Sequence, residues 1–298
     1  MRSRRKNTHQ SNKVMKPFVF LFDIDGTIIG EILPQVCEWE IINLFDKSKL
    51  TQFKKNLCSQ LKTGLIRSGF TTYLDFLKLK HPTAEFFIYT ASDGIWAQFL
   101  VPCIESVIGI QFHRPLFTRK HCNFNAPLTK GTHQHHQKSI SGILPILLKK
   151  LKVQYPDVTE KHIMNNICLI DNNHVLSQPE SRKLIMCPSY YYIDVYDIIR
   201  LIPEEILMSQ YGDISIILKK YGFFPKTDTR NISFLVFKKM YFEYVASWIK
   251  EKLKQSSQID NFWPKLGNVM HKLDDYERLD NSVIKSINAG IGIIMPIE

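Results

Sequence analysis

The chain has 298 residues, of which 44% are hydrophobic and 22% are charged, and its formal net charge at pH 7 is +11. This composition is ordinary for a globular protein with one large domain and an appendage, and no uninterrupted apolar stretch approaches the ~20 residues that cross a bilayer. Six cysteines without a CxxC pair or a preceding secretory signal indicate free thiols in an intracellular protein of the nucleus or the cytoplasm.

The N-terminal segment, residues 1–16, carries six basic side chains and no acid, which leaves a net charge of only +5 on the other 282 residues. Because this segment has no apolar periodicity, we expect a solvated, disordered basic tail. A nuclear-type signal and an arm that contacts nucleic acid or another polyanion are the alternatives. The body of the chain is only mildly basic, which is weak evidence for nucleic-acid binding.

Three short apolar runs follow along the chain: FVFLF at 18–22, EFFIY at 85–89 and NICLI at 166–170. They are rich in aromatic and β-branched residues and do not alternate with polar ones, which is typical of parallel strands buried on both faces. Each run ends in small polar residues. Ligands of such sheets bind beyond the carboxyl ends of the strands, so we expect these polar residues to converge on one crevice.

Helical patterns lie between and after these runs. Residues 36–47 have apolar side chains near helical spacing, and residues 142–155 form a second candidate with Pro145 in the first turn, where proline is tolerated. Residues 191–207 predict a further strand or helix that closes the domain. This order favours an α/β domain over residues 17–208, with a doubly wound, Rossmann-like parallel sheet and no large cap.

The last ninety residues, 209–298, predict a mixed or helical extension to which the sequence assigns no function. Within it, residues 241–253 place apolar side chains at i, i+3, i+4 and i+7, which indicates one amphipathic helical face. We expect this face to pack against the preceding domain; a partner or a membrane surface is the alternative. The apolar side chains of this face are Tyr241, Tyr244, Val245 and Trp248.

Two acids, Asp23 and Asp25, end the first apolar run, and Gly26 allows a sharp turn after them. Two neighbouring carboxylates repel unless one is protonated or a cation lies between them. Mg²⁺ with oxygen ligands resolves this repulsion, and Asp171 and Asn172, at the end of the third run, would complete the shell. A lone Asp-x-Asp-Gly also occurs by chance in surface turns, so the inference depends on the whole ordered set.

A carboxylate beside Mg²⁺ can attack phosphorus and form an aspartyl phosphate. Phosphoryl transfer needs a nucleophile, an acid or base, a hydroxyl, a lysine and a metal. The ends of the three runs offer Asp23, Asp25, Thr90 and the Asp171–Asn172 pair, and a lysine precedes the third run. Taken singly, a threonine often ends a strand and DNN is often a turn; their occurrence in this order favours a phosphoryl-transfer site.

These motifs resemble those of the haloacid dehalogenase-like (HAD) phosphatase superfamily. DIDGT is similar to its first motif, DxDxT, while FFIYTAS and LIDNN resemble its second and fourth motifs. IYTAS, RPLFTRKHC, QKSISGIL and LIDNN are closest to the family of RNA polymerase II C-terminal-domain phosphatases and NLI-interacting-factor-like proteins. The resemblance covers residues 17–208.

The resemblance implies three catalytic residues. Asp23 would be the nucleophile, Asp25 the general acid/base, and Lys138 the lysine that neutralises the phosphoryl charge. Lys130 is a rival for that lysine, but we favour Lys138 because an apolar helical run follows it directly.

The resemblance also implies a Mg²⁺ site and substrate contacts. The expected metal ligands are Asp23, Asp25, Asp171 and Asn172. The expected substrate contacts are Thr90, Ala91 and Arg119.

Histidines and a cysteine near Arg119 invite a zinc interpretation, but their spacing is not a standard structural zinc pattern, and we expect a solvated loop. The residues are His121, Cys122, His133, His135 and His136. The segment between the second and third motifs spans only about forty residues and shows no helical lid. A weakly covered site would admit a phosphorylated side chain of a protein.

The expected function is therefore that of a Mg²⁺-dependent phosphatase that removes phosphate from Ser or Thr of a protein. The resemblance names the RNA polymerase II C-terminal tail as a candidate partner. A nucleic-acid 3′-phosphatase or another HAD phosphohydrolase is the alternative, which the basic tail would suit. A non-catalytic HAD-like scaffold that only binds ligands in the crevice is the third hypothesis.

Overall fold

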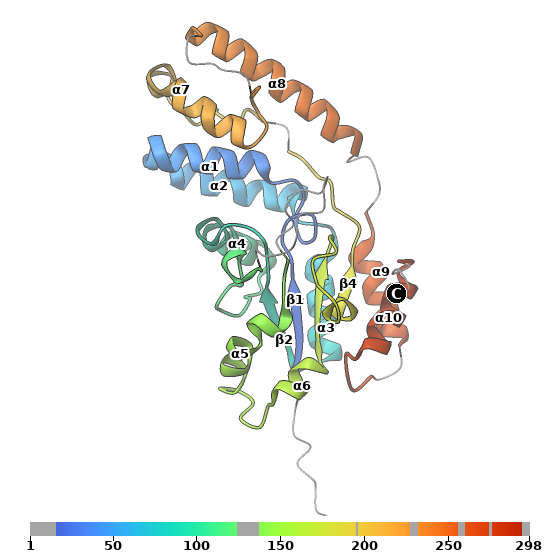
Figure 1. Cartoon of the computed structure of the whole chain (residues 1–298). Helices are drawn as coiled ribbons and strands as arrows, with labels where there is room; N and C mark the ends of the chain where they lie inside the picture. The colour runs from blue at the N-terminus through green and yellow to red at the C-terminus, as the bar shows by residue number, and fades with distance from the viewer. Residues whose placement is uncertain are drawn as a thin grey trace, which may run out of the picture.

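Four parallel strands form one sheet in the spatial order β2-β1-β3-β4 (Figure 1). They are β1 (Phe18–Phe22), β2 (Ala84–Ile88), β3 (Ile167–Asp171) and β4 (Leu184–Met186). The first three match the predicted strands to within one residue. The computed structural model describes residues 16–123, 137–194, 196–226, 232–255, 260–273 and 276–293.

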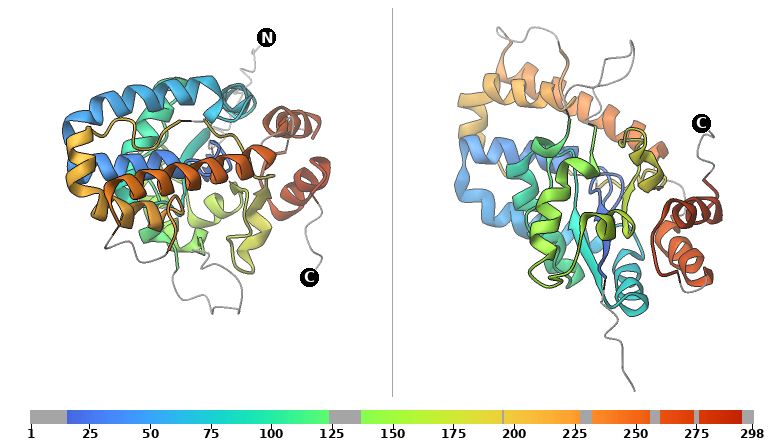
Figure 2. Two further views of the ribbon diagram at one scale, coloured as in Figure 1. Left: turned by 90° about the horizontal axis from the view of Figure 1, so that it is seen from above. Right: turned by 60° about the horizontal axis from the view of Figure 1, so that its bottom comes forward.

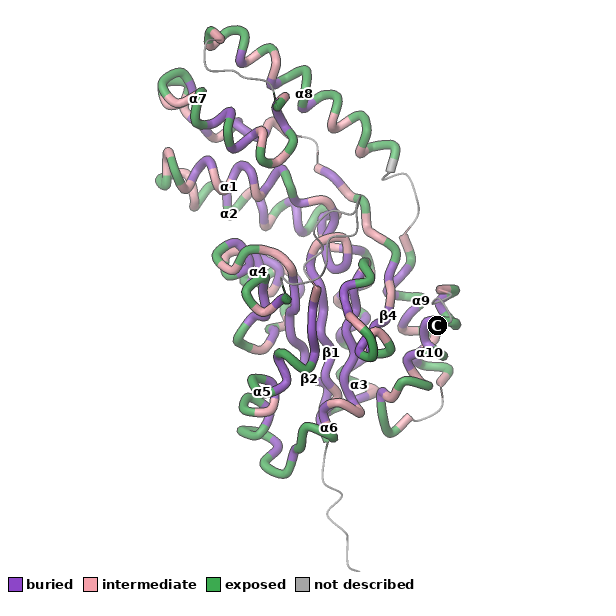
Figure 3. Tube along the Cα trace, in the orientation of Figure 1, coloured by how far each residue is buried: buried purple, intermediate pink, exposed green. Residues whose placement is uncertain are grey.

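Helices cover both faces of the sheet, whose strands are almost wholly buried (Figure 3). One apolar core joins the sheet to α5 (Ile140–Leu151) and α6 (Glu160–Met164). The other joins it to α3 (Phe70–Lys80), α4 (Gly94–Ile108) and α9 (Phe262–Lys272). Burial on both faces explains why the strands read as continuous apolar runs, and it confirms the predicted doubly wound, Rossmann-like α/β fold.

A stack of four helices lies on the side of the molecule toward which the strands run (Figures 1 and 2). They are α1 (Leu33–Phe45), α2 (Leu50–Gln60), α7 (Glu204–Lys220) and α8 (Phe234–Gln255). α1 contacts both α2 and α7, and α8 contacts α7. Shorter turns complete the path of the chain: η1 (Lys47–Lys49), η2 (Leu61–Leu65), η3 (Arg119–His121) and η4 (Glu180–Lys183).

The C-terminal helices α9 and α10 (Asn281–Gly290) pack against the sheet domain. Trp263 on α9 is fully buried, with its ring 6.1 Å from that of Phe22 on β1. On α10, Asn288 accepts a hydrogen bond from Met186 N–H and donates one to Leu184 O, so it covers the open edge of β4. Elements on both sides of residue 208, which itself lies within α7, thus contribute to one core.

Two local predictions are wrong. Residues 191–203 form no strand or helix in the described part of the chain, and α7 begins only at Glu204, after Pro203. The backbone there is irregular, but its apolar side chains are still buried. Their spacing therefore reflects packing into the core and does not indicate a helix or a strand. Helix α5 begins at Ile140, which makes Pro145 its sixth residue and places it beyond the first turn.

The predicted amphipathic helix lies within α8, but its buried face is narrower than expected. Tyr241 and Val245 are buried, whereas Tyr244 is 42% exposed. Tyr241 Oη donates to Asp197 Oδ1 over 2.6 Å, which ties α8 to the irregular segment before α7. None of the described helices is both long and apolar enough to cross a membrane.

Candidate active site

Asp23 and Asp171 lie side by side at the carboxyl ends of β1 and β3. The two strands are parallel neighbours with Phe22 opposite Ile170, and Asp23 N–H donates to Ile170 O over 3.0 Å. Asp23 is 6% exposed and Asp171 1%. The apolar strands thus carry two acids that are far apart in the sequence to one buried point, as predicted for the ends of these runs.

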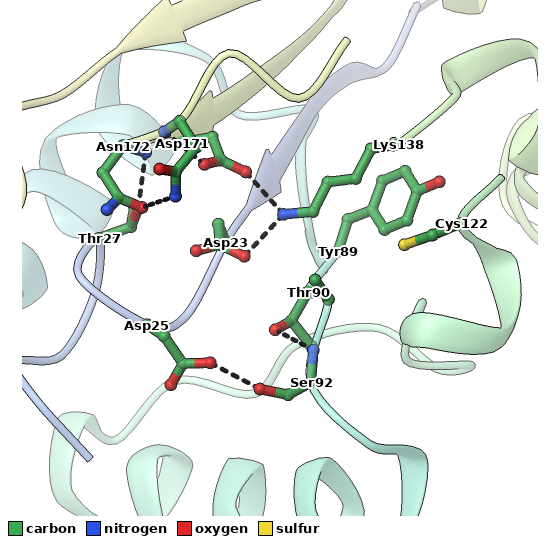
Figure 4. Close-up of polar contacts among 12 residues, drawn as sticks. Asp23, Asp25, Thr27, Tyr89, Thr90, Ser92, Cys122, Lys138, Asp171 and Asn172 are labelled. Atoms are coloured by element: carbon green, nitrogen blue, oxygen red, sulfur yellow. Dashed lines mark hydrogen bonds and ion pairs between the residues drawn. The ribbon is translucent and has the colours of Figure 1, made fainter. Parts of the chain in front are cut away.

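Lys138 joins these two acids. Its Nζ donates to Asp23 Oδ1 and to Asp171 Oδ2, each over 2.6 Å (Figure 4). Its backbone N–H donates to Val175 O, and the next residue, Ser139, caps the N-terminus of α5, so the lysine is held from both sides. Burial would lower the pKa of Lys138, but the two carboxylates outweigh it and raise this pKa.

Asp25 faces the same space from the loop after β1. Its Oδ2 accepts a hydrogen bond from Ser92 Oγ over 2.5 Å, whereas its buried Oδ1 has no hydrogen-bond partner among the described residues. Burial raises the pKa of Asp25. Burial and the neighbouring Asp171 raise the pKa of Asp23 to about 8, against the opposing effect of Lys138.

The cluster carries more negative than positive charge. Three carboxylates, those of Asp23, Asp25 and Asp171, surround one ammonium group, that of Lys138, so the formal charge of the ionised cluster is −2. Repulsion between buried carboxylates is costly unless protons or a cation reduce it. The arrangement therefore favours the binding of a divalent cation or of a polar substrate that brings one.

Thr90 and Ala91 form the loop that follows β2. Thr90 is fully buried, and its Oγ1 accepts a hydrogen bond from Ser92 N–H over 3.1 Å. Ala91 O accepts a hydrogen bond from Arg119 Nε over 2.9 Å, which places the exposed Arg119 side chain against this loop. All three predicted substrate contacts are thus adjacent, and Ser92 links their loop to Asp25.

Asn172 is held beside the turn that follows β1. Its Oδ1 accepts from Thr27 Oγ1 over 3.2 Å, and its Nδ2 donates to Ser189 Oγ over 2.9 Å. Gly26 has a φ of +73°, and a Cβ there would lie 2.6 Å from Asn172 Nδ2. Two reasons therefore favour glycine at this position: the left-handed backbone conformation, and the close approach of the Asn172 side-chain amide.

Sequence reasoning missed several residues that build the site. Tyr89 Oη accepts from Ser139 N–H and donates to His121 O, and its ring centre lies 5.5 Å from Lys138 Nζ. Ser92 pairs with Asp25 as described above. Ser92 lies within the quoted TAS triplet and could have been singled out, but the link from Tyr89 to Ser139 joins residues far apart in the sequence and has no local signal.

The zinc interpretation finds no support within the described residues, where no group of three His, Cys, Asp or Glu side chains is placed to hold a metal. There, His121 Nδ1 accepts a hydrogen bond from Thr118 N–H, and Cys122 is buried. His133, His135, His136 and Lys130 lie outside the described residues.

Comparisons with known proteins add little. No family model matches the chain, and no curated protein matches it. Among solved structures, the chain is similar to Fcp1, described as an essential RNA polymerase II CTD phosphatase, with 14% identity over 91% of this chain and 70% of that one. The TM-score is 0.34, an overlap too low to infer a function.

Proposed function

We propose that this protein is a phosphatase that hydrolyses phosphoric monoesters through a covalent phosphate on Asp23. The observation that supports this most is the position of Lys138, whose Nζ lies 2.6 Å from both Asp23 Oδ1 and Asp171 Oδ2 at the ends of adjacent strands. A lysine so held can stabilise both an ionised nucleophile and the charge of a phosphoryl group.

The reaction would take place in two displacements. A carboxylate oxygen of Asp23 attacks phosphorus, the bond from phosphorus to the ester oxygen breaks, and Asp25 gives its proton to the leaving alcohol. Asp25 then takes a proton from water, which attacks the acyl phosphate and releases inorganic phosphate and free Asp23. The raised pKa of Asp25 suits the proton-donating step, and Ser92 holds its carboxyl group in place.

Mg²⁺ fits the donors that the site presents. Only one oxygen of Asp23 accepts a hydrogen bond from a described side chain, Asp25 Oδ1 has no described partner, and the cluster is two negative charges in excess. Asp23 and a backbone oxygen of Asp25 would hold the ion, which would neutralise charge on the phosphoryl oxygens. Mg²⁺ needs few protein ligands because water and substrate oxygens complete its shell.

Asp171 and Asn172 were expected among the metal ligands, but their side-chain oxygens already have protein partners. Asn172 Oδ1 accepts hydrogen bonds from Thr27 Oγ1 and from Asn173 Nδ2. Asp171 Oδ2 accepts from Lys138 Nζ, and its Oδ1 accepts from Asn173 N–H over 2.8 Å. We therefore assign Asp171 the role of holding Lys138 in place. In the same proposal, Thr90 contacts the phosphoryl oxygens and Arg119 contacts the substrate chain.

A phosphorylated Ser or Thr of a protein is the proposed substrate. The IYTAS, RPLFTRKHC and LIDNN stretches support this choice, and they make the C-terminal tail of RNA polymerase II the first natural sequence to test. The alternative, a nucleic-acid 3′-phosphatase, is tested by the same assay with a 3′-phosphorylated oligonucleotide.

The decisive experiment is hydrolysis of p-nitrophenyl phosphate with Mg²⁺ and with EDTA. We expect turnover by the wild type only with Mg²⁺, and none by Asp23→Asn. Asp213→Asn is the matched control, because Asp213 is exposed on α7 and far from the site in the sequence. Equal turnover by wild type and Asp23→Asn would reject the proposal.

A further inference from the structure

A groove of about 870 Å³ opens beside the candidate active site. The first residues of α4 form one wall and the loop that follows α4 forms the other. The residues that matter below are Asp93, Ile95, Arg114, Pro115, Arg119 and Lys120.

The groove is continuous with the loop that carries Thr90 and Ala91. Asp93 directly follows Ser92, whose Oγ donates to Asp25. On the other wall, Arg119 Nε donates to Ala91 O. A chain bound in this groove would therefore lie beside the loop that carries Thr90 and Ala91.

The groove combines an apolar surface with a basic rim. Ile95 is 69% exposed, and Pro115 lies opposite on the loop, so both walls of the groove present apolar surface. Three basic side chains and one acid line the groove. Arg114 is paired in bidentate fashion with Glu105, whereas Lys120 is exposed and no described residue pairs with it.

The lining also distinguishes between classes of substrate. It contains no aromatic side chain among the described residues, and aromatic rings are the usual platforms for the bases of single-stranded nucleic acid. Aliphatic and proline surface beside Lys120, which has no described partner, suits a polypeptide with an apolar side chain and an anionic one. The one acid of the lining, Asp93, caps the N-terminus of α4, and its Oδ1 accepts a hydrogen bond from Ile95 N–H over 2.8 Å.

We infer that this groove docks the polypeptide that flanks the phosphorylated residue, with an anionic side chain of the substrate at Lys120 and an apolar one on Ile95. The inference rests on the proposed phosphatase function and specifies its substrates: phosphopeptides with a carboxylate or a second phosphate close to the scissile phosphate. Lys120 and Ile95 are thus residues that determine specificity, and neither touches the reacting atoms.

The test compares three phosphopeptides of one sequence, with a neutral residue, a glutamate or a second phosphoserine at positions one to four from the phosphoserine. For the wild type we expect kcat/KM to rise about tenfold from the neutral to the doubly phosphorylated peptide, mainly through KM. In Lys120→Glu this preference should vanish or reverse. Ile95→Ala should lower kcat/KM for all three peptides and leave kcat/KM for p-nitrophenyl phosphate unchanged. The glutamate and phosphate peptides show which anion is preferred.

Lys149→Glu, which changes an exposed lysine of α5 outside the groove, is the matched control and should retain the preference. Loss of preference in this control, or an equal fall of peptide and p-nitrophenyl phosphate turnover in Lys120→Glu, would overturn the docking inference. So would an oligonucleotide 3′-phosphate that is hydrolysed better than every peptide and depends on Lys120.

Binding measured without turnover separates the two proposals. Fluorescence anisotropy with Asp23→Asn protein and the labelled doubly phosphorylated peptide should show binding that is weakened about tenfold by adding Lys120→Glu. If the wild type hydrolyses nothing while this binding difference persists, the phosphatase function fails and the groove remains a phosphopeptide site. Unchanged binding rejects the groove even if the enzyme is active.

Discussion

Two buried ionic clusters of this protein can be compared. In the structural cluster, Arg67 is 1% exposed and forms a bidentate pair with Asp260, at 2.7 and 2.8 Å. Its third nitrogen donates to Pro188 O over 2.9 Å, and its guanidinium lies 4.7 Å from the Phe262 ring centre. One positive charge meets one negative charge there, and each guanidinium nitrogen has a partner.

The candidate catalytic cluster, formed by Asp23, Asp25, Lys138 and Asp171, is built differently. Lys138 faces Asp23 and Asp171, with Asp25 close by, and one carboxylate oxygen of Asp25 has no described partner. The contrast shows that a buried charge alone does not indicate a function. The excess negative charge and the Asp25 oxygen without a described partner, at the carboxyl ends of parallel strands, are what the proposed divalent cation would satisfy.

The largest effect should follow from removing the positive charge of Lys138 in the candidate catalytic cluster. Lys138→Met is expected to lower kcat/KM by about a thousandfold, because the phosphoryl charge loses its preorganised counter-charge. The measurement is p-nitrophenyl phosphate hydrolysis with Mg²⁺ at saturating concentration. Lys149→Met should behave as the wild type. Activity of Lys138→Met within tenfold of the wild type would contradict the assigned role.

Breaking the structural cluster should lower the stability of the fold and leave kcat nearly unchanged. Asp260→Asn leaves Arg67 buried without its counter-charge, and we expect the free energy of unfolding to fall by about 3 kcal/mol. Urea denaturation measures this, and kcat of the folded protein should change less than threefold.

A double variant, Arg67→Met with Asp260→Leu, should recover much of that loss, since it removes both charges. A loss of kcat as large as that of Lys138→Met, with stability unchanged, would place Arg67 and Asp260 in the catalytic machinery and remove the contrast between the clusters.

The two clusters also differ in how far the sequence predicted them. Asp23 and Asp171 end continuous apolar runs, and parallel strands bring such ends together, so the candidate catalytic cluster follows from a local pattern. Arg67 and Asp260 are separated by 193 residues and have no pattern around them, so only the folded chain pairs them. Short β4, with three residues, likewise lacks enough sequence for a periodicity to be detected.

The lysine of the site shows an intermediate case. The apolar run after Lys138 predicted a helix, and α5 begins two residues later, at Ile140. Lys138 contacts two acids, whereas Lys130 lies outside the described residues, so the choice between the two lysines stays a prediction. The sequence predicted a sharp turn at Gly26 and a place for Asn172 in the shell of a cation. Their mutual contact, which excludes any side chain at residue 26, depends on the loop geometry that only the structure gives.

Mg²⁺ should distinguish the clusters by a further measurement. At about one hundred times its Kd, an ion that binds only the folded protein raises the free energy of unfolding by about 2.7 kcal/mol. We expect this gain in the wild type and in Asp260→Asn, and its loss in Asp23→Asn, as read from thermal unfolding with Mg²⁺ or EDTA. An equal gain in Asp23→Asn would show that the ion binds elsewhere.

A third buried acid, Glu38 on α1, sharpens the comparison with a smaller effect. Its counter-charge is distant, because Arg200 Nε lies 3.8 Å from its Oε1, and neither Glu38 oxygen makes a hydrogen bond of normal geometry with a described residue. Burial raises the pKa of Glu38 from 4.5 to about 8, and Arg200 and the nearby Tyr196 hydroxyl only partly oppose this. Glu38 is therefore an acid whose charge is poorly compensated, at a position that the proposed chemistry does not use.

This raised pKa has a definite consequence for stability. Between pH 4.5 and about 8 the folded protein keeps a proton on Glu38 that the unfolded chain has released, so the free energy of unfolding falls as the pH rises through this range. Glu38→Gln should match the wild type near pH 4 and exceed it by roughly 2 kcal/mol near pH 6. Urea denaturation at the two pH values measures the difference, with exposed Glu251→Gln as the control. Identical pH slopes in wild type and Glu38→Gln would mean that Arg200 compensates this acid as fully as Arg67 compensates Asp260.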